Sequence, residues 1–420
     1  MLSADWEVNV PVLEGPALTD KGRIQRDAVQ RGLVLVLLST VALVAIGLVM
    51  VFSATAPTSI RSVDADPNQQ LFSVAVRQVV SAIGGLIFGL VLALLPSKIF
   101  NSKLAHGALG LGILLQIGVL VQGGEGVGGN NNWLDIGPIA IQPSEFLKLA
   151  MVVWLAYMLG RLSLKEIQVP ETLVIPTLGF TASIGVVALG GDMGTALIFG
   201  MIALGMFWLA GMRGKHLVVP LIIGAFFAGI FVVARPSRLR RVSEFFGDLV
   251  NLPDIHSPTQ IEFAQFAFGS GGLTGVGIGA GKEKWWDLKA AHTDFIFAVI
   301  GEELGLLGVL TIVALFLTLG WGLKEIAVHH PDRYGQLLAG GAATWLAGQA
   351  FANMLVVAGL LPVFGVTLPF ISYGGSSMIA TLGMVGMVVG CALGVPGVKE
   401  SWRVRGKLAQ RTRTLIRRNG

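Results

Sequence analysis

The chain has 420 residues, of which 53% are hydrophobic and only 13% are charged, and its mean hydropathy is +0.73. Soluble domains carry about 25% charged residues, so this composition excludes an ordinary soluble protein and indicates an integral membrane protein. The 57 glycines fit that class, because small residues let membrane helices approach closely. The net charge of +5 is modest, and most basic residues lie in tails and short loops, which argues for membrane topology and against nucleic-acid binding.

The two ends of the chain are polar. Residues 1–32 contain no apolar core of the kind found in a cleavable signal peptide, so we interpret them as a cytoplasmic tail before an uncleaved signal anchor. Residues 396–420 form a basic tail, which we also place in the cytoplasm. The single cysteine, Cys391, lies in an apolar run and excludes an intrachain disulfide.

Apolar runs near the length of a membrane span, about 20 residues, recur along the chain. About ten of them predict an all-α, polytopic membrane protein. In chain order the predicted spans are 33–54, 78–96, 105–122, 145–160, 172–190, 194–211, 216–234, 294–321, 338–358 and 375–395.

Lysine and arginine predict the orientation of this membrane domain, 33–395. The segments that would face the cytoplasm hold most of them, whereas the short outer segments hold only Arg61 and Arg77. Both termini are therefore expected in the cytoplasm, and two large loops, 123–144 and 235–293, are expected outside.

The second outer loop contains a glycine-rich run that superficially resembles a phosphate-binding loop. It fails that pattern, because Val276 stands where the first glycine belongs and Glu283 follows Lys282 in place of Ser or Thr. We interpret the run as a flexible or re-entrant connector.

Asp294 lies where this loop ends and an apolar run begins. A carboxylate at the mouth of a span can be both ionised and positioned, and ionisable residues at membrane depth are commonly functional. The alternative is a helix N-cap, although Thr293 could cap equally well. Glu302 and Glu303 lie about 12 Å deeper on the same helix, where a structural hydrogen-bond clamp is the better explanation.

Other polar residues gather near the predicted outer face. Glu145 and Lys148 are three residues apart and can pair, either as a structural ion pair or inside a polar cavity. Arg238 and Arg241 suit a pyrophosphate ligand or, equally, lipid phosphates. Trp133 is typical of an interfacial aromatic belt, with stacking on a sugar ring as the alternative.

The stretch 361–377 contains two prolines and several glycines, which argue against a regular helix. Irregular backbone near membrane depth is tolerated where protein or a water-filled cavity satisfies it. This stretch therefore predicts a cavity lining, with a plain surface turn as the alternative.

Several of these segments resemble the SEDS family (shape, elongation, division and sporulation), over about residues 30–395. The motifs that carry the resemblance are His292-Thr293-Asp294-Phe295-Ile296-Phe297, Gly301-Glu302-Glu303-Leu304-Gly305, Gly365-Val366-Thr367-Leu368-Pro369, Ser372-Tyr373-Gly374-Gly375-Ser376-Ser377, Gln142-Pro143-Ser144-Glu145 with Lys148, and Asp192-Met193-Gly194-Thr195. Their combination and order are highly specific.

The resemblance implies a GT-C-like SEDS fold and a peptidoglycan glycosyltransferase that polymerises lipid II on the outer face of the bacterial cytoplasmic membrane. It implies a class B penicillin-binding protein as partner, other divisome proteins nearby, and a place at the division septum. It favours the FtsW branch over the RodA branch. Asp294 matches the family's catalytic aspartate. The candidate substrate-binding residues are Trp133, Glu145, Lys148, Arg238, Arg241, Gln260, His292, Thr293, Ser372 and Ser376.

The chain departs from the family pattern at several positions. Gly128-Gly129-Asn130-Asn131-Asn132-Trp133 stands where the family usually has Asn-Gly-Ala-x-Arg-Trp, so the arginine is missing. Lys289-Ala290 replaces the usual Pro-Glu before the catalytic stretch. Gly191 stands in place of proline, and Phe263 in place of a glutamine. These departures concern substrate contact and leave Asp294 itself unchanged.

Our mechanistic hypothesis is that Asp294 accepts the proton of the acceptor hydroxyl as it attacks the anomeric carbon, with inversion. Arg238, Arg241 and Lys148 would hold the pyrophosphate, and a divalent cation, Mg²⁺ or Mn²⁺, could substitute for them. A lipid II flippase or transporter is the first alternative, since intramembrane charges and broken helices would serve it too. An elongation-specific polymerase and a division scaffold are the others.

Overall fold

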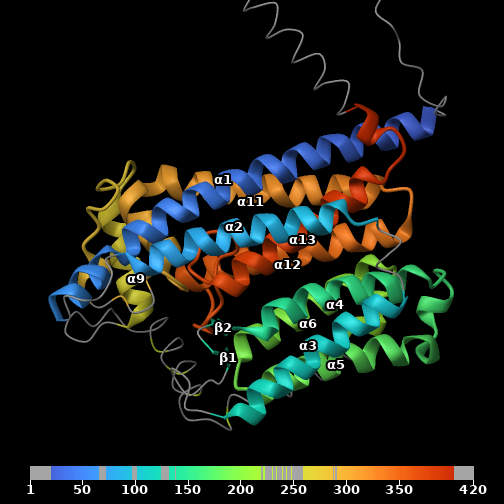
Figure 1. The fold of residues 1–420 in the computed structure, drawn as a ribbon, viewed down its shortest axis with the longest axis horizontal. Helices are drawn as coiled ribbons and strands as arrows, with labels where there is room; N and C mark the ends of the chain where they lie inside the picture. The colour runs from blue at the N-terminus through green and yellow to red at the C-terminus, as the bar shows by residue number, and fades with distance from the viewer. Residues whose placement is uncertain are drawn as a thin grey trace, which may run out of the picture.

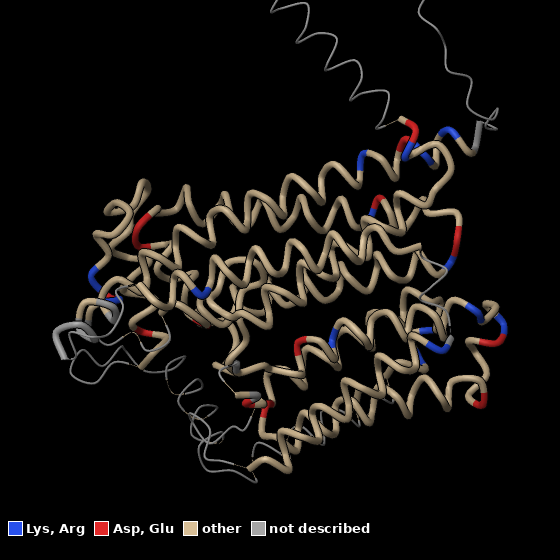
Figure 2. Tube along the Cα trace, viewed as in Figure 1, with Lys and Arg blue, Asp and Glu red and all other residues tan. Residues whose placement is uncertain are grey.

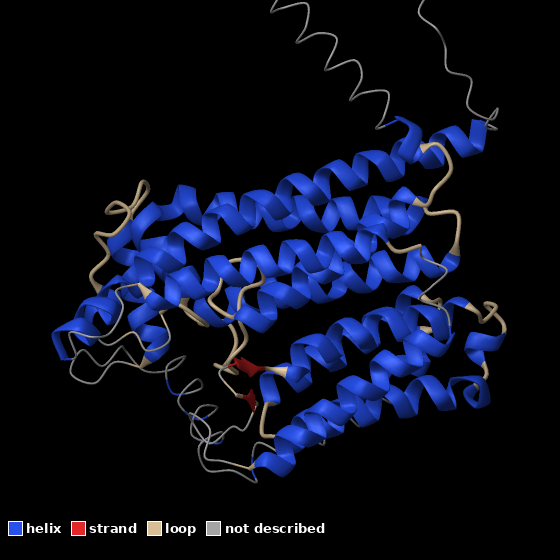
Figure 3. Cartoon of the chain, viewed as in Figure 1, coloured by secondary structure: helices blue, strands red, loops and turns tan. Residues whose placement is uncertain are grey.

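The computed structural model describes residues 20–65, 72–96, 102–123, 132–137, 139–218, 221–222, 259–286, 288 and 291–401, with isolated positions between 229 and 247. This part of the chain is almost entirely helical (Figure 3). The helices are α1 (Asp20–Ala65), α2 (Ser73–Leu94), α3 (Ser102–Gln122), α4 (Pro143–Gly160), α5 (Val174–Leu189), α6 (Met193–Leu209), α9 (Gln260–Gly271), α10 (Glu283–Trp286), α11 (Ile296–His329), α12 (Arg333–Val357) and α13 (Gly375–Leu393). Two 3₁₀ turns, Glu166–Gln168 and Pro170–Leu173, precede α5.

The all-α prediction is confirmed, and every predicted span except 216–234 coincides with a described helix. Most of 216–234 lies outside the described residues. Six helices of the described chain are long and apolar enough to cross a membrane, and α6 is a shorter apolar helix. The central helices α4 and α12 bury most of their side chains inside the protein, which accounts for the polar residues they carry.

Two helix pairs run side by side along most of their length, α1 with α11 and α2 with α13 (Figure 1). Glycines allow this close approach: a Cβ on Gly32 would lie 2.6 Å from the carbonyl oxygen of Gly322, and one on Gly386 would lie 2.0 Å from that of Gly89. Helices α3, α4, α5 and α6 form a second group, and α12 contacts both α11 and α4.

The two ends of the bundle differ in charge. Most described lysines and arginines gather at the end where α1 begins and α13 ends (Figure 2). The opposite end carries α9, α10 and a short hairpin of β1 (Leu134–Ile136) and β2 (Ile139–Ile141). This asymmetry agrees with the positive-inside rule and with cytoplasmic termini. We therefore refer to the end with the hairpin as the outer end.

Three differences from the predicted elements are the most pronounced. Helix α1 begins at Asp20, inside the segment assigned to the N-terminal tail. Helix α11 continues to His329, beyond the predicted end of its span. The outer loop 123–144 contains the β-hairpin, which sequence reasoning missed because its strands have only three residues each.

The glycine-rich run after α9 inserts into a break in α11. Gly305 has φ 65° and ψ −164°, so the helical hydrogen bonding of α11 is interrupted there. The freed carbonyl oxygens of Glu302 and Glu303 accept hydrogen bonds from the amides of Val276 and Gly277, both at 3.0 Å. The amides of Leu306 and Leu307 donate in turn to the carbonyls of Gly272 and Leu273. This exchange satisfies backbone groups that apolar surroundings would otherwise leave unpaired.

Candidate active site

Asp294 lies in a turn, residues 291–295, at the outer end of α11. The helix begins at Ile296 with Phe295 as its N-cap residue, so Asp294 lies one position before the cap. Ala291 and Phe295 are buried, whereas Asp294 is only partly buried, as are His292 and Thr293. Ala291 and Phe295 fix the two ends of the turn in the protein interior, and Asp294 between them remains within reach of solvent.

The 361–377 stretch packs directly against this turn. The Ser372 hydroxyl donates to the Thr293 carbonyl at 2.6 Å, and the Tyr373 amide donates to the His292 carbonyl at 2.8 Å. A Cβ on Gly365 would lie only 3.6 Å from Oδ2 of Asp294, so the backbone there passes close to the carboxylate. The structure thus brings together four of the predicted site residues: Asp294, His292, Thr293 and Ser372.

Helix α2 supports the same stretch from the other side. The buried amide of Gln78 donates to the carbonyl of Ser372 at 3.1 Å and accepts from the amide of Gly374 at 3.2 Å. Sequence reasoning missed Gln78, although a glutamine inside a predicted apolar span was a usable signal, because burying an amide is costly without partners.

Two further amides that sequence reasoning missed lie one turn apart on α12. Asn353 Nδ2 donates to the carbonyl of Asp294 at 2.8 Å and to that of Val366 at 2.7 Å. Gln349 Nε2 donates to the carbonyl of Thr367 at 2.9 Å. Helix α12 therefore holds both the Asp294 turn and the 361–377 stretch.

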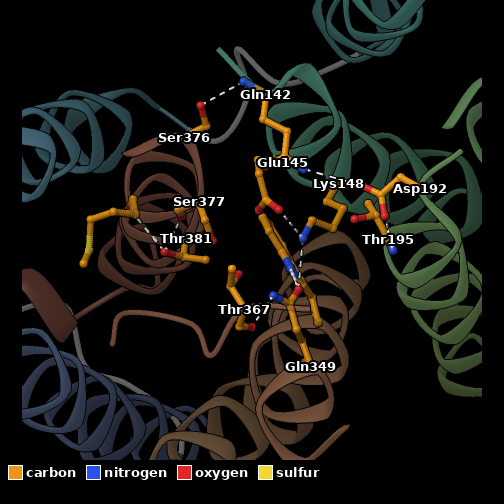
Figure 4. A network of polar contacts seen from close by, with 12 residues as sticks. Gln142, Glu145, Lys148, Asp192, Thr195, Gln349, Thr367, Ser376, Ser377 and Thr381 are labelled. Atoms are coloured by element: carbon orange, nitrogen blue, oxygen red, sulfur yellow. Dashed lines mark hydrogen bonds and ion pairs between the residues drawn. The ribbon is translucent and has the colours of Figure 1, made fainter. Parts of the chain in front are cut away.

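Lys148 and Glu145 form a buried pair at the start of α4 (Figure 4). The Lys148 ammonium lies 3.0 Å from Glu145 Oε1 and 3.0 Å from Gln349 Oε1, and it faces the Trp345 ring with 5.3 Å to the centroid. Lys148 is 1% exposed and Glu145 is 4% exposed. Burial removes both from direct contact with a substrate in this conformation, so the assignment of Lys148 to pyrophosphate is corrected: its charge is already matched by Glu145.

Ser376 joins α13 to the start of α4. Its hydroxyl accepts the backbone amide of Gln142 at 3.0 Å, and the Gln142 side chain reaches Asp192 Oδ2 at 3.5 Å (Figure 4). Asp192 in turn caps α6 by accepting from the Thr195 amide at 2.9 Å. Ser376 is 7% exposed, so the structure gives it a role in helix packing and not an open surface.

The remaining predicted residues lie elsewhere or outside the described chain. Trp133 precedes β1 and is 45% exposed. Gln260 is the first residue of α9, whose N-terminus is closed by a capping box between Thr259 and Glu262. Arg238 and Arg241 lie outside the described residues, as do the departures Asn130, Asn131, Lys289 and Ala290.

Buried charges anchor the connector between α9 and α11. The Lys284 ammonium pairs with Glu303 and also contacts the hydroxyl and carbonyl oxygens of Ser53 on α1. Glu302 accepts the backbone amides of Lys282 and Glu283. These contacts agree with the structural clamp expected for the two adjacent glutamates.

His292 and Glu283 are ionisable groups outside the spans whose pKa values are shifted. Burial lowers the pKa of His292 below its ordinary value of 6.5, because the imidazolium is poorly solvated there. Burial and the neighbouring Glu302 charge raise the pKa of Glu283. A neutral imidazole is therefore the favoured form beside Asp294 at neutral pH.

The described residues do not provide a complete cage for a divalent cation. Within them, no group of three or more His, Cys, Asp or Glu side chains could hold a metal. Mg²⁺ is often bound by one or two carboxylates together with substrate phosphates. Asp294 could therefore contribute one ligand to such an ion if a substrate phosphate supplied others. A role for Mg²⁺ or Mn²⁺ stays a prediction.

A family model described as "Cell cycle protein", covering FtsW, RodA and SpoVE, matches residues 33–393. The chain belongs to this family. It is 34% identical over 374 residues to the probable peptidoglycan glycosyltransferase FtsW of Geobacter metallireducens, which covers 88% of this chain and 96% of that protein. The corresponding protein of Bacillus subtilis is 34% identical over 370 residues, covering 84% and 88%.

Solved structures show the same fold. The rod shape determining protein RodA of Thermus thermophilus matches with a TM-score of 0.61 and 28% identity, covering 85% of this chain and 95% of that one. A chain from a peptidoglycan synthase complex, whose title concerns the coordination of polymerization and crosslinking, matches with a TM-score of 0.66 and 28% identity, covering 84% and 95%.

Proposed function

We propose that this protein is a peptidoglycan glycosyltransferase of the FtsW type, which polymerises lipid II at the outer face of the membrane with Asp294 as general base. The observation that carries the proposal is the partly exposed Asp294 carboxylate at the outer end of the bundle, held between α11 and the 361–377 stretch. Relatives at 34% identity carry the name of this activity.

The reaction joins an acceptor hydroxyl to the anomeric carbon of the growing strand and releases a lipid pyrophosphate. Asp294 takes the hydroxyl proton as the new C–O bond forms, and the bond to pyrophosphate breaks with inversion at that carbon. A general base must be ionised and within hydrogen-bond reach of the proton it takes. Asp294 is partly exposed in a held turn, and we propose that it meets both requirements there.

General-base assistance is typically worth about 10²–10⁴ in rate, so positioning and charge stabilisation must supply the rest. The leaving pyrophosphate needs cationic partners. Because Lys148 is buried against Glu145, Arg238 and Arg241 are the basic residues we assign to this task. We propose that Trp133 and Gln260 contribute to sugar or lipid contacts from the two outer loops.

We propose a class B penicillin-binding protein as partner and the division septum as location. The partner is supported by the solved peptidoglycan synthase complex, one chain of which is 28% identical to this protein. The septum is supported by relatives named FtsW. An elongation-specific role of the RodA type is the second candidate, because RodA is among the solved structures that match. Loss of septal wall synthesis, with elongation intact, on depletion of the protein would separate the two roles.

The test of the catalytic role is Asp294→Asn in purified protein supplied with lipid II, compared with Asp332→Asn as the matched control. Asp332 precedes α12 at the cytoplasmic end, so its loss leaves the site intact. We expect polymerisation to fall by about 10²–10⁴ for the first variant and to stay near wild type for the second. Wild-type polymerisation by Asp294→Asn would refute the proposal.

A flippase remains the competing function, and it is separated by one assay. Protein in vesicles is supplied with labelled lipid II, and both glycan polymer and movement of the label between leaflets are measured. We expect polymer that depends on Asp294. Transbilayer movement without polymer would favour the transporter instead.

A further inference from the structure

The outer half of α12 carries three polar side chains at intervals of four residues: Trp345, Gln349 and Asn353. That spacing places them on one helical face. All three are buried, at no more than 1% exposure. Buried amides are costly unless they are hydrogen-bonded, so their presence in an apolar helix requires partners. The partners of Asn353 are the most telling.

Asn353 bridges the two segments that make up the site. Its Nδ2 donates one hydrogen to the Asp294 carbonyl at 2.8 Å and the other to the Val366 carbonyl at 2.7 Å. Val366 follows Gly365, whose backbone passes close to the Asp294 carboxylate. One amide group therefore fixes the backbone of Asp294 relative to the segment that its carboxylate faces.

We propose that Asn353 is a positioning residue for the transfer reaction: it sets the place of Asp294 by holding Asp294 and Val366 at a fixed separation. The inference rests on the proposed role of Asp294. Gln349 acts beside it on the Thr367 carbonyl, but its own oxygen also accepts from Lys148 and from the Trp345 indole, so its contribution is shared. Asn353 alone of these two reaches the Asp294 backbone.

The two carbonyl groups that Asn353 contacts require an uncharged side chain that can donate two hydrogen bonds. Both groups facing Nδ2 are carbonyl oxygens, which accept and cannot donate, so the amide can take only one orientation. Oδ1 is buried without a hydrogen-bond partner among the described residues. An aspartate at this position would place a carboxylate against two carbonyls, whereas a serine would keep a single donor.

The experiment compares Asn353→Leu, Asn353→Asp and Asn353→Ser in the full-length protein, with lipid II polymerisation and lipid II binding measured separately. A misplacement of about 1 Å costs on the order of 10²-fold in rate, so we expect kcat to fall by about 10–100-fold in the leucine and aspartate variants. Binding of lipid II should change less than about threefold. The serine variant should recover part of the lost kcat.

Gln116→Leu is the matched control. Gln116 is a fully buried amide on α3, and its side chain has no hydrogen-bond partner among the described residues. Replacing it by an apolar side chain of similar size should leave kcat at wild type, because no bond is lost. Melting temperature and elution volume in detergent report whether each variant is folded.

Each outcome decides a different point. Wild-type kcat in Asn353→Leu, with Asp294→Asn inactive, overturns this inference and leaves the proposed function standing. Equal losses of kcat and of lipid II binding overturn it as well, because they indicate a structural role alone. Full activity of Asp294→Asn overturns the proposed function instead. If Asn353→Leu does not fold, Asn353→Ser decides, and a wild-type kcat there overturns the inference.

Discussion

The connector before Asp294 is anchored by a buried ion pair between Lys284 and Glu303, and replacing Lys284 tests that role. The side chains of both residues are 0% exposed, and the Ser53 hydroxyl bonds to both. Replacing Lys284 by methionine keeps the apolar stem but leaves the Glu303 carboxylate buried with Ser53 as its remaining side-chain partner. We expect that single change to be severe, because a buried charge loses its counter-ion.

The expected loss in the free energy of unfolding follows from the burial of the Lys284–Glu303 pair. Removing one partner of a buried pair costs about 3–5 kcal/mol, whereas replacing both by apolar residues is often neutral or stabilising. Lys284→Met should therefore lower the free energy of unfolding by about 3–5 kcal/mol. The double variant Lys284→Met, Glu303→Met should recover most of that loss, since no charge remains buried.

The assay is denaturant titration of the purified protein in mixed micelles, combined with hydrogen exchange of residues 272–288. We expect faster exchange in Lys284→Met and near wild-type exchange in the double variant. A loss below about 1 kcal/mol in Lys284→Met would refute the reasoning, as would a double variant less stable than the single one. Either result would mean that the pair is solvated or that the connector is held by its backbone bonds alone.

Two further predictions concern the backbone break and the site histidine. Gly305→Ala should lower the melting temperature strongly, because the φ of Gly305 is 65° and a Cβ there would lie 2.3 Å from the Gly275 nitrogen. Gly320→Ala on the same helix is the control. A Cβ there would lie 3.7 Å from the Cβ of Ala347, its nearest atom, so the melting temperature should not fall. Because burial lowers the pKa of His292 below 6.5, the unfolded chain binds more protons near pH 6, so stability should fall as pH drops below about 6.5 and return above it. His292→Gln should weaken that pH dependence of the melting temperature, and an unchanged profile would contradict it.

The spans and the place of Asp294 at the end of one of them could be predicted, because both depend on local patterns. Runs of about 20 apolar residues report membrane helices directly, and a carboxylate at the end of such a run is visible in the sequence. Pro143 and Ser144 indicated the start of α4, which begins at Pro143. The clamp role of Glu303 was also accessible, because adjacent acids in a span demand partners.

The support of the site could not be predicted, because its contacts join segments far apart in the chain. Gln78 and Ser372 are 294 residues apart, and Asn353 and Asp294 are 59 apart. A single sequence shows that such amides are present in apolar helices but not which carbonyls they meet. The break at Gly305 was hidden for a related reason: a glycine in an apolar helix is common, and only the inserted connector explains its positive φ.

The burial of charge at the outer end narrows where the pyrophosphate can be held. Lys148 and Lys284 are both buried, and each is matched by a glutamate, Glu145 and Glu303. A matched buried ammonium offers little to a phosphate, since binding would require breaking the pair and its hydrogen bonds. These lysines are therefore engaged in structural ion pairs. Our proposal therefore assigns recognition of the leaving group to Arg238 and Arg241, which lie outside the described residues.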